Sequence, residues 1–272
     1  MDEIDRFLDE DLNGEGDVTS NVLFTDETTK ARIIAKDSAV LAGLEEARIV
    51  FHKTGARLTK IFEDGSSVQS GDVIALIEGP VKSILIGERL ALNFLGRMSG
   101  IATETYKVVK KCHEINPNVN IAATRKTTPG FRRYEKKAVQ LGGGIPHRFG
   151  LFDVVMIKDN HIAAKKSFFQ TLEDVTTKVT DKTIEVEVET EKQALQAARM
   201  NVDVIMLDNF PAEKAKIVAK KIKSINPSIK IEISGGITPE NILDYVTFAD
   251  RISMGYLTHT IKNKDFSLEI IS

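Results

Sequence analysis

A chain of 272 residues, 42% of them hydrophobic and 28% charged, can hold one large α/β barrel or a barrel with a smaller companion domain. Its net charge of −2 gives no reason to expect nucleic acid as a partner, and one cysteine, Cys112, excludes an intramolecular disulfide and a cysteine-rich zinc site. The acidic start, MDEIDRFLDEDLNGEGD, does not resemble a targeting signal, and no apolar run approaches membrane-spanning length. We therefore expect a cytoplasmic protein that does not enter a membrane.

The first hundred residues have the pattern of a small α+β domain. One helix is expected at 44–54, and turns are marked by Asp64-Gly65 and Ser70-Gly71-Asp72. The strand-like runs around them lie at 31–36, 38–42, 57–63 and 72–78. We interpret this region as an N-terminal α+β sandwich domain.

A long helical tract follows Gly79-Pro80 and runs roughly from Ile84 to Glu114. We expect this helix to bridge two domains, because no low-complexity linker separates the two halves of the chain. The boundaries expected are 1–104 for the first domain with its bridging helix and 105–272 for the second. The tail at 259–272 is expected to pack back on the first domain.

The second half repeats a strand–helix pattern. Six apolar runs alternate with helical stripes, and they lie at 120–126, 154–160, 184–189, 203–209, 230–235 and 251–256. Such alternation is typical of a parallel sheet with right-handed crossovers. Because six units are fewer than a complete barrel needs, we expect an open or incomplete parallel α/β barrel of six to seven strands. A doubly wound open sheet is the alternative.

Charged and glycine-rich segments stand where these strands end. In a parallel barrel, reactive groups collect at the C-terminal ends of the strands. The residues found there are Arg125, Lys126, Lys158, Glu187, Glu189, Asp208, Ser234-Gly235-Gly236 and Met254-Gly255. Buried cations need an anion, and glycines expose backbone N–H groups that bind phosphate. The sequence therefore predicts a pocket for a small, multiply anionic substrate.

Carboxylates are expected inside the same barrel. Glu185, Glu187 and Glu189 share one face by period two, and the other face is apolar. Glu232 and Ser234 repeat this pattern two strands later. A lattice of structural ion pairs is one interpretation; a site that uses acids for a metal or for developing positive charge is the interpretation that we favour.

Other charged residues are weaker candidates. Four cations near an apolar helical stripe are expected toward its wetter faces: Arg132, Arg133, Lys136 and Lys137. Structural roles are favoured for His161 and His259, whereas His147, which follows Gly142-Gly143-Gly144, stands between a structural and a ligand-binding role.

Several common chemistries have no support in this sequence. It contains no GxxxxGK[ST] loop, no HExxH, no GxSxG elbow and no acidic-pair phosphoribosyl pyrophosphate (PRPP) loop. Electrostatic stabilisation by the charged strand ends is the better hypothesis. A metabolite-binding protein on a degenerate barrel and a Schiff-base aldolase that uses Lys158 remain alternatives of other classes.

Motifs from about Gly16 to Thr260 resemble the quinolinate phosphoribosyltransferase family. They are, in chain order, GEGDVTS, ERLALNFLGRMSGIAT, TRKTTPG, GGGIPHRFGL, IKDNHI, IEVEVE, IMLDNF, SGGI and MGYLTH. The resemblance implies a reaction in which the ring nitrogen of quinolinate attacks C1 of PRPP. Pyrophosphate leaves with the help of Mg²⁺, and the 2-carboxylate is lost as CO₂ to give nicotinate mononucleotide.

The resemblance also implies roles for individual residues. The substrate anions would be bound by Thr124, Arg125, Lys126, His147, Arg148 and Lys158. Glu187 and Asp208 would hold ribose hydroxyls or Mg²⁺, either directly or through Mg²⁺ that arrives on PRPP, and would act catalytically together with Lys126. The 5′-phosphate would lie on the backbone of Ser234, Gly235, Gly236, Met254 and Gly255.

In this family the arginine that matches Arg89 reaches the neighbouring subunit's site, which implies an obligate homodimer and leaves a higher oligomer open. Ile145-Pro146 departs from the family pattern and puts an asparagine contact at that point in doubt. A molybdate-associated paralogue that uses PRPP with another acceptor is the alternative, which Lys158 and the full TRKTTPG motif disfavour.

Overall fold

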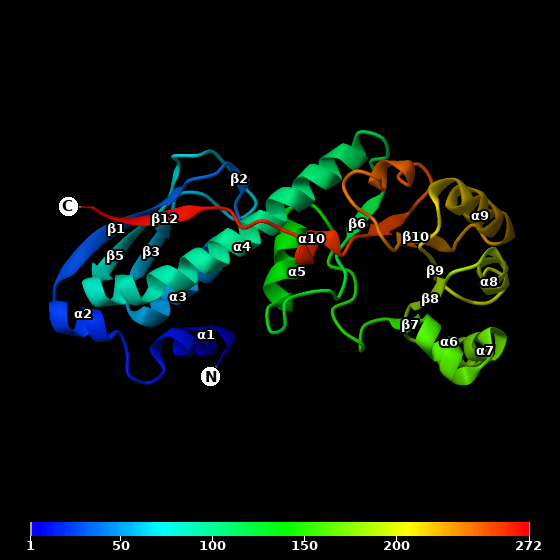
Figure 1. Cartoon of the computed structure of the whole chain (residues 1–272), viewed down its shortest axis with the longest axis horizontal. Coiled ribbons are helices and arrows are strands. Elements are labelled where there is room, and N and C mark those ends of the chain that lie inside the picture. The colour runs from blue at the N-terminus through cyan, green and yellow to red at the C-terminus, as the bar shows by residue number, and fades with distance from the viewer. Residues whose placement is uncertain (1, 272) are drawn as a thin grey trace. The chain divides into compact units, whose positions relative to one another are not determined.

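The structure is a computed structural model that describes residues 2–271 (Figure 1). Its contacts divide the chain into two compact units. The first unit contains the residues up to Tyr106, the segment Arg133–Gly143 and the residues from Ile261 onward. The second unit contains Lys107–Arg132 and Gly144–Thr260. The division differs from one boundary at residue 104, because a segment from the middle of the chain joins the first unit.

An antiparallel sheet with the order β12-β1-β5-β3 forms the centre of the first unit. Its strands are β1 (Thr28–Ala35), β3 (Arg57–Lys60), β5 (Val73–Pro80) and β12 (Phe266–Ile271); a second, small sheet pairs β2 (Ala39–Val40) with β4 (Ser67–Val68). The C-terminal β12 pairs with β1 from Lys30↔Ile271 to Ala35↔Phe266. The end of the chain therefore completes the sheet of the first unit.

The helices of the first unit supply the rest of its core. They are α1 (Glu3–Leu12), α2 (Val18–Leu23), α3 (Leu44–Thr54), most of α4 (Val81–His113) and most of α5 (Arg132–Leu141). Residues of α3, α4 and β1, among them Phe51, Phe94 and Ile33, are almost completely buried. The expected helix at 44–54 and the long bridging helix are confirmed.

Helix α5 corrects one expectation about its cations. Lys136 does not face solvent but is fully buried, next to the equally buried Glu135. Arg97 of α4 donates to Glu135 Oε1 through Nε at 3.1 Å and Nη2 at 2.7 Å. The buried face of this helix is therefore wider than its apolar stripe predicted, because ion pairing allows charged side chains to enter a core.

The second unit is built on a six-stranded parallel sheet with the order β6-β11-β10-β9-β8-β7. The strands are β6 (Asn120–Ala122), β7 (Val155–Ile157), β8 (Ile184–Val188), β9 (Val204–Asp208), β10 (Lys230–Ser234) and β11 (Arg251–Ser253). From β7 to β11, strands that follow one another in the chain are neighbours in the sheet, without the reversal of a doubly wound fold. The ring stays open between β6 and β7, so the incomplete parallel barrel is confirmed.

The helices between these strands run along the outer side of the sheet (Figure 1). They are α6 (Asp159–Lys165), α7 (Phe168–Lys178), α8 (Glu191–Ala197) and α9 (Ala212–Ile225). A 3₁₀ turn, η1 (Ile242–Asp244), precedes β11, and the short α10 (Tyr256–His259) follows it. Within residues 2–271, no helix combines the length and the apolar character needed to cross a membrane.

Candidate active site

A cavity of about 930 Å³ opens at the C-terminal ends of the parallel strands, and all of its lining residues belong to the second unit. Branched aliphatic side chains usually fill the interior of such a barrel. Here Glu187, Glu232 and Ser253 line the cavity, and Glu185 is buried with only 1% of its surface exposed. The prediction that carboxylates and cations share the barrel interior is confirmed.

Two cations of the cavity stand in the loop that follows β6. Arg125 and Lys126 line the cavity, and hydrogen bonds at both ends of the Lys126 backbone fix the loop. The Lys126 N–H donates to Thr124 Oγ1 at 3.1 Å, and Thr258 Oγ1 donates to the Lys126 carbonyl at 2.7 Å. The sequence TRK thus forms a turn that holds its basic side chains in place.

Arg148 is buried, at 9% exposure, and is less exposed than Arg125, Lys126 and Lys158, the other Arg and Lys residues of the cavity. Burial lowers its pKa, and the nearby Arg125 lowers it further. Both effects mean that the positive charge is less favourable here than in water, although an arginine keeps its proton. An anion placed beside the two guanidinium groups would relieve this cost, so the geometry favours a carboxylate or phosphate ligand.

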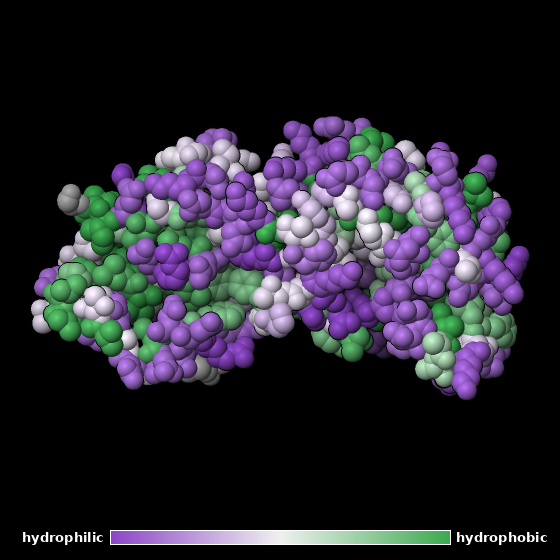
Figure 2. Space-filling model, viewed as in Figure 1, coloured by the Kyte–Doolittle hydropathy of each residue, from purple (hydrophilic) through white to green (hydrophobic). Residues whose placement is uncertain are grey.

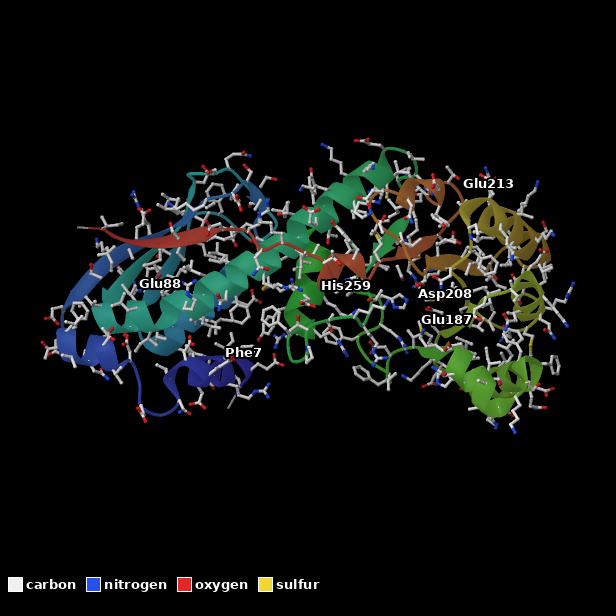
Figure 3. All side chains as sticks on the ribbon, viewed as in Figure 1. Phe7, Glu88, Glu187, Asp208, Glu213 and His259 are labelled. Atoms are coloured by element: carbon white, nitrogen blue, oxygen red, sulfur yellow. The ribbon has the colours of Figure 1, made fainter. Side chains whose placement is uncertain are left out.

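Acidic side chains from two neighbouring strands lie at the same edge (Figure 3). Glu187 of β8 forms an ion pair with Lys158, which follows β7. Asp208 ends β9 and accepts a hydrogen bond from Asn209 Nδ2 at 2.6 Å. Burial raises the pKa of Asp208, and the charge of Glu189 adds to this effect, while Lys158 and Lys126 oppose it. The edge therefore combines Glu187, whose carboxylate is paired with a cation, with Asp208, whose ionised form is less favourable.

The Ser234-Gly235-Gly236 turn depends on two successive glycines with a left-handed backbone. Gly235 and Gly236 have φ values of +86° and +62°. A Cβ on Gly235 would lie 2.3 Å from Asn209 Oδ1, whereas a Cβ on Gly236 would meet nothing within 4 Å. Neighbouring atoms therefore exclude a Cβ only at Gly235. At Gly236 the cavity has open space, which lets a ligand approach the backbone closely.

The last strand end contributes Gly255 but not the side chain of Met254. A Cβ on Gly255 would lie 2.9 Å from His259 Nε2 and 3.0 Å from Lys126 Cδ, so glycine makes room for both side chains. Met254 is fully buried, and its N–H donates to the Ala122 carbonyl at 3.0 Å. That N–H belongs to the sheet and is not available to a phosphate.

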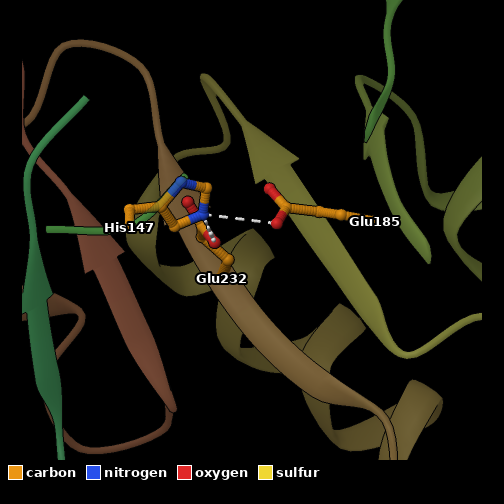
Figure 4. Close-up of side chains that lie close together, drawn as sticks. All are labelled: His147, Glu185 and Glu232. Carbon is orange, nitrogen blue, oxygen red and sulfur yellow. Dashed lines mark ion pairs between the residues drawn. The ribbon is translucent and has the colours of Figure 1, made fainter. Parts of the chain in front are cut away.

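At the floor of the cavity, His147 lies between two buried glutamates (Figure 4). Its Nε2 is 3.3 Å from Glu185 Oε2 and 3.4 Å from Glu232 Oε2. Arg251 donates to Glu185 Oε2 at 2.7 Å and also contacts Glu232, which accepts a hydrogen bond from Ser253 as well. Burial alone would lower the pKa of His147, but the two carboxylates outweigh it, and the pKa is raised.

Most of the residues predicted for the site line this one cavity: Thr124, Arg125, Lys126, His147, Arg148, Lys158, Glu187, Asp208, Ser234, Gly235, Gly236 and Gly255. Glu189 is exposed and is not among them. Arg89 belongs to the first unit, is exposed on α4 and has no ion-pair partner among residues 2–271. Lining residues that the sequence did not predict include Asn209, Thr238, Glu240, Tyr256, His259 and Thr260.

Two of these missed residues had a signal in the sequence. Asn209 follows Asp208 directly, and asparagine is one of the few residues that tolerate a left-handed backbone, here with φ of +56°. His259 lies one helical turn after Gly255, the spacing that puts two residues on one face. The others lie in irregular segments, for which periodicity predicts no direction.

Two groups of side chains have the donor atoms of a metal site. Glu187 and Asp208 are of the type that Mg²⁺ takes, but Glu187 is already neutralised by Lys158. Since Mg²⁺ usually keeps waters and binds through substrate phosphates with one or two carboxylates, these residues fit a Mg²⁺ that arrives on a phosphorylated ligand. The ligand atoms of His147, Glu185 and Glu232 lie within 4.8 Å of one another, but Arg251 already supplies the positive charge there.

Comparisons with known proteins agree with this geometry. The family model of the quinolinate phosphoribosyl transferase C-terminal domain matches residues 101–269, and that of the N-terminal domain matches residues 17–99. A probable nicotinate-nucleotide pyrophosphorylase (carboxylating) of Archaeoglobus fulgidus is 42% identical over 259 residues, which are 94% of this chain and 98% of that protein. A similar protein of Bacillus subtilis is 40% identical over 98% of this chain and 92% of its own length.

The likeness extends to solved structures. The crystal structure of NadC from Streptococcus pyogenes superposes with a TM-score of 0.89 at 36% identity, and the match covers 99% of this chain and 98% of that one. With both family domains matched and relatives aligned over nearly their whole lengths, the chain belongs to the quinolinate phosphoribosyl transferase family.

Proposed function

We propose that this enzyme transfers the phosphoribosyl group of PRPP to the ring nitrogen of quinolinate, with loss of CO₂, to form nicotinate mononucleotide in NAD biosynthesis. The observation that carries the proposal is the convergence of Arg125, Arg148 and Lys158 on one cavity that is also lined by four acids and a glycine turn. A pyridine dicarboxylate and a sugar phosphate are the kinds of ligand that such a set can hold together. The transferase activity agrees with the names of the curated relatives.

The cations bind and orient the acceptor. Arg125 and Arg148 offer planar forks to a carboxylate, and Lys158 offers a point charge. Because binding two carboxylates fixes the plane of the pyridine ring, the ring nitrogen is held in line with the sugar. Much of the rate enhancement then comes from proximity, which can lower a barrier by roughly 7–11 kcal/mol when the alignment is good.

The acids act on the donor sugar. Positive charge develops on the ribose as pyrophosphate leaves, and fixed carboxylates stabilise such charge best in a site that excludes water. Glu187 and Asp208 stand at the ends of adjacent strands and hold the ribose hydroxyls. The backbone of Ser234, Gly235 and Gly236 binds the 5′-phosphate, and Lys126 binds the pyrophosphate side of the donor. Mg²⁺ bound to the pyrophosphate would neutralise charge on the leaving group.

A homodimer with Arg89 shared between subunits is the second part of the proposal. Arg89 is exposed and has no ion-pair partner in the described part of the chain, as expected of a residue that acts outside its own unit. Helix α2 presents Val18, Val22 and Leu23 to solvent at 64%, 84% and 64% exposure, and the surface there is strongly apolar (Figure 2). Apolar side chains gathered in this way are typical of a surface that a partner covers. A cytoplasmic location completes the proposal, since a lone buried Cys112 needs no oxidising compartment.

The decisive experiment incubates the enzyme with PRPP, Mg²⁺ and quinolinate labelled at its 2-carboxylate. Release of labelled CO₂ in step with nicotinate mononucleotide would establish both the acceptor and the decarboxylation. Omission of PRPP is the control and should stop the release. Binding of PRPP without release of CO₂ from quinolinate would refute quinolinate as the acceptor and would still support PRPP as the donor.

A further inference from the structure

We propose that Glu185, Glu232 and Arg251 are positioning residues of the quinolinate site, which hold the His147 ring as an imidazolium whose second N–H is free to bind a substrate carboxylate. The inference rests on the proposed function for the identity of the ligand. It goes beyond that function because it gives a positioning role to three residues, of which only Glu232 lines the cavity.

The orientation of the ring is the first argument. Nε2 faces the two glutamates at ion-pair distances of 3.3 and 3.4 Å, and Nδ1 points away from both of them (Figure 4). Because carboxylate oxygens offer only lone pairs, two of them near Nε2 favour a proton on that nitrogen. The second nitrogen is then the one that serves the cavity, which His147 lines. It donates to an anion only if the ring is doubly protonated.

The balance of charge is the second argument. Two buried carboxylates, Glu185 at 1% and Glu232 at 0% exposure, share one arginine, Arg251. Among residues 2–271, His147 is the one ion-pair partner besides Arg251 that could balance the second negative charge, and an unpaired buried charge is costly. The raised pKa of His147 agrees with this balance. The other charges around the ring are the cavity's own cations, Arg125 and Lys126 after β6 and the adjacent Arg148.

The backbone is the third argument. His147 has φ of +52°, a conformation that residues other than glycine rarely adopt. Such strain persists only where the surroundings fix it, and it concentrates at functional sites. Here the fixed partners come from three different strands: Glu185 from β8, Glu232 from β10 and Arg251 from β11. The register places Arg251 directly beside Glu232, so the contact is built into the sheet.

The test measures the titration of His147 in the enzyme without substrate, by NMR of the imidazole signal that His147→Gln removes. We expect the wild-type pKa to lie above that of a free histidine. Glu232→Gln and Glu185→Gln keep the side-chain shape, remove one negative charge each and should lower the His147 pKa. Arg251→Met should raise it, since both carboxylates then lose their other counter-charge. Glu213→Gln, an exposed change on α9, is the matched control and should leave it unchanged.

Kinetics then test the role in binding. Glu232→Gln should raise the KM for quinolinate by about tenfold or more, which corresponds to a lost charge-assisted hydrogen bond, with little change in the KM for PRPP. In the wild type, affinity for quinolinate should fall as pH rises through the His147 pKa. A change in kcat alone would indicate a merely structural role and would overturn the assignment.

The titration tests the positioning role of these three residues independently of the proposed reaction with quinolinate. An unshifted wild-type His147 pKa, or shifts in the same direction for Glu232→Gln and Arg251→Met, would overturn the proposal even in an active enzyme. Opposite shifts in a protein that does not release CO₂ from quinolinate would support the network as the holder of a charged His147 and would refute the proposed acceptor instead. The wild-type measurement needs no variant, so the test survives a variant that does not fold.

Discussion

Lys158 and Glu187 form an ion pair between the end of β7 and the neighbouring strand β8, at the wall of the cavity. The two partners are unequal, because the Lys158 side chain is 38% exposed and that of Glu187 only 11%. The lysine thus neutralises a more deeply buried carboxylate while it keeps one side open to a ligand. An anion that binds Lys158 must share it with Glu187, so binding of the acceptor and the state of this acid are coupled.

This pair predicts a double-mutant cycle. Lys158→Ala should raise the KM for quinolinate at least about tenfold and lower the free energy of unfolding by about 1 kcal/mol, because Glu187 is left without its cation. Glu187→Gln should leave the fold intact and lower kcat. The double variant should regain the stability but not the activity, as measured by urea unfolding and by steady-state kinetics. Strictly additive losses of stability would show that the pair is not coupled.

Gly235 and Gly236 form a matched pair for a second prediction. Both have positive φ, but only Gly235 has its neighbour Asn209 where a Cβ would stand. Gly235→Ala should therefore lower the free energy of unfolding by about 1–3 kcal/mol, through clash and strain together. Gly236→Ala carries the strain alone and should cost about 1 kcal/mol. Thermal unfolding of both variants compares them directly; equal losses would mean that the contact with Asn209 is relaxed at little cost.

Periodicity predicted the barrel well, because each parallel strand is a short apolar run and each connecting helix has one apolar face that covers the sheet. All six runs from 120–126 to 251–256 contain an observed strand. The charged strand ends were predictable for the same reason, since topology alone brings them to one edge. What the sequence could not supply is pairing between distant charges. Glu135 is paired with Arg97 of another helix and His147 lies between glutamates of two separate strands, and no spacing in the chain reveals either contact.

The half-buried carboxylate of Asp208 is expected to lower the stability of the fold while activity depends on it. Its folded pKa is raised by burial above the ordinary 3.8, so the folded state holds this proton to higher pH than the unfolded chain. The free energy of unfolding therefore falls as pH rises from the unfolded to the folded pKa, and at neutral pH the ionised Asp208 destabilises the fold. Asp208→Asn should raise the stability at neutral pH, with a smaller gain as pH is lowered, and should abolish turnover.

Urea unfolding across pH measures this effect, and Asp244→Asn is the control. Asp244 is exposed in the same unit and lies outside the cavity, so its replacement should change neither stability nor activity. A less stable Asp208→Asn at neutral pH would show that hydrogen bonds to this carboxylate outweigh its burial.

The Arg97–Glu135 pair predicts where the first unit is most sensitive. Glu135 has no exposed surface, and Arg97 donates two hydrogen bonds to it. Removal of one partner leaves a buried charge, so Glu135→Ala should cost about 3–5 kcal/mol. The surface pair Arg32–Glu269 is the control: Glu269 is 39% exposed, and Glu269→Ala should cost less than about 1 kcal/mol. Chemical denaturation of both variants measures the contrast, and losses of similar size would contradict it.

Arg89 predicts a defect that only a second subunit can repair. Arg89→Ala removes an exposed side chain, so stability and oligomeric state should stay as in the wild type, while turnover should be lost. Lys158→Ala damages the cavity of the second unit instead. The two variants are mixed at a quinolinate concentration low enough that neither turns over by itself. If the partner supplies Arg89, then subunit exchange creates dimers with one cavity in which Lys158 is intact and the arriving arginine is wild type.

The expected recovery follows from counting. Random exchange at equal concentrations makes half of the dimers mixed, and each of these holds one complete site of two. Activity should therefore return to about a quarter of the wild-type value, by statistics alone. Lys82→Ala, a change on the same helix away from the family motif, is the control and should stay active without mixing. No recovery at any ratio, with exchange verified by differently tagged subunits, would place Arg89 in a role confined to its own chain.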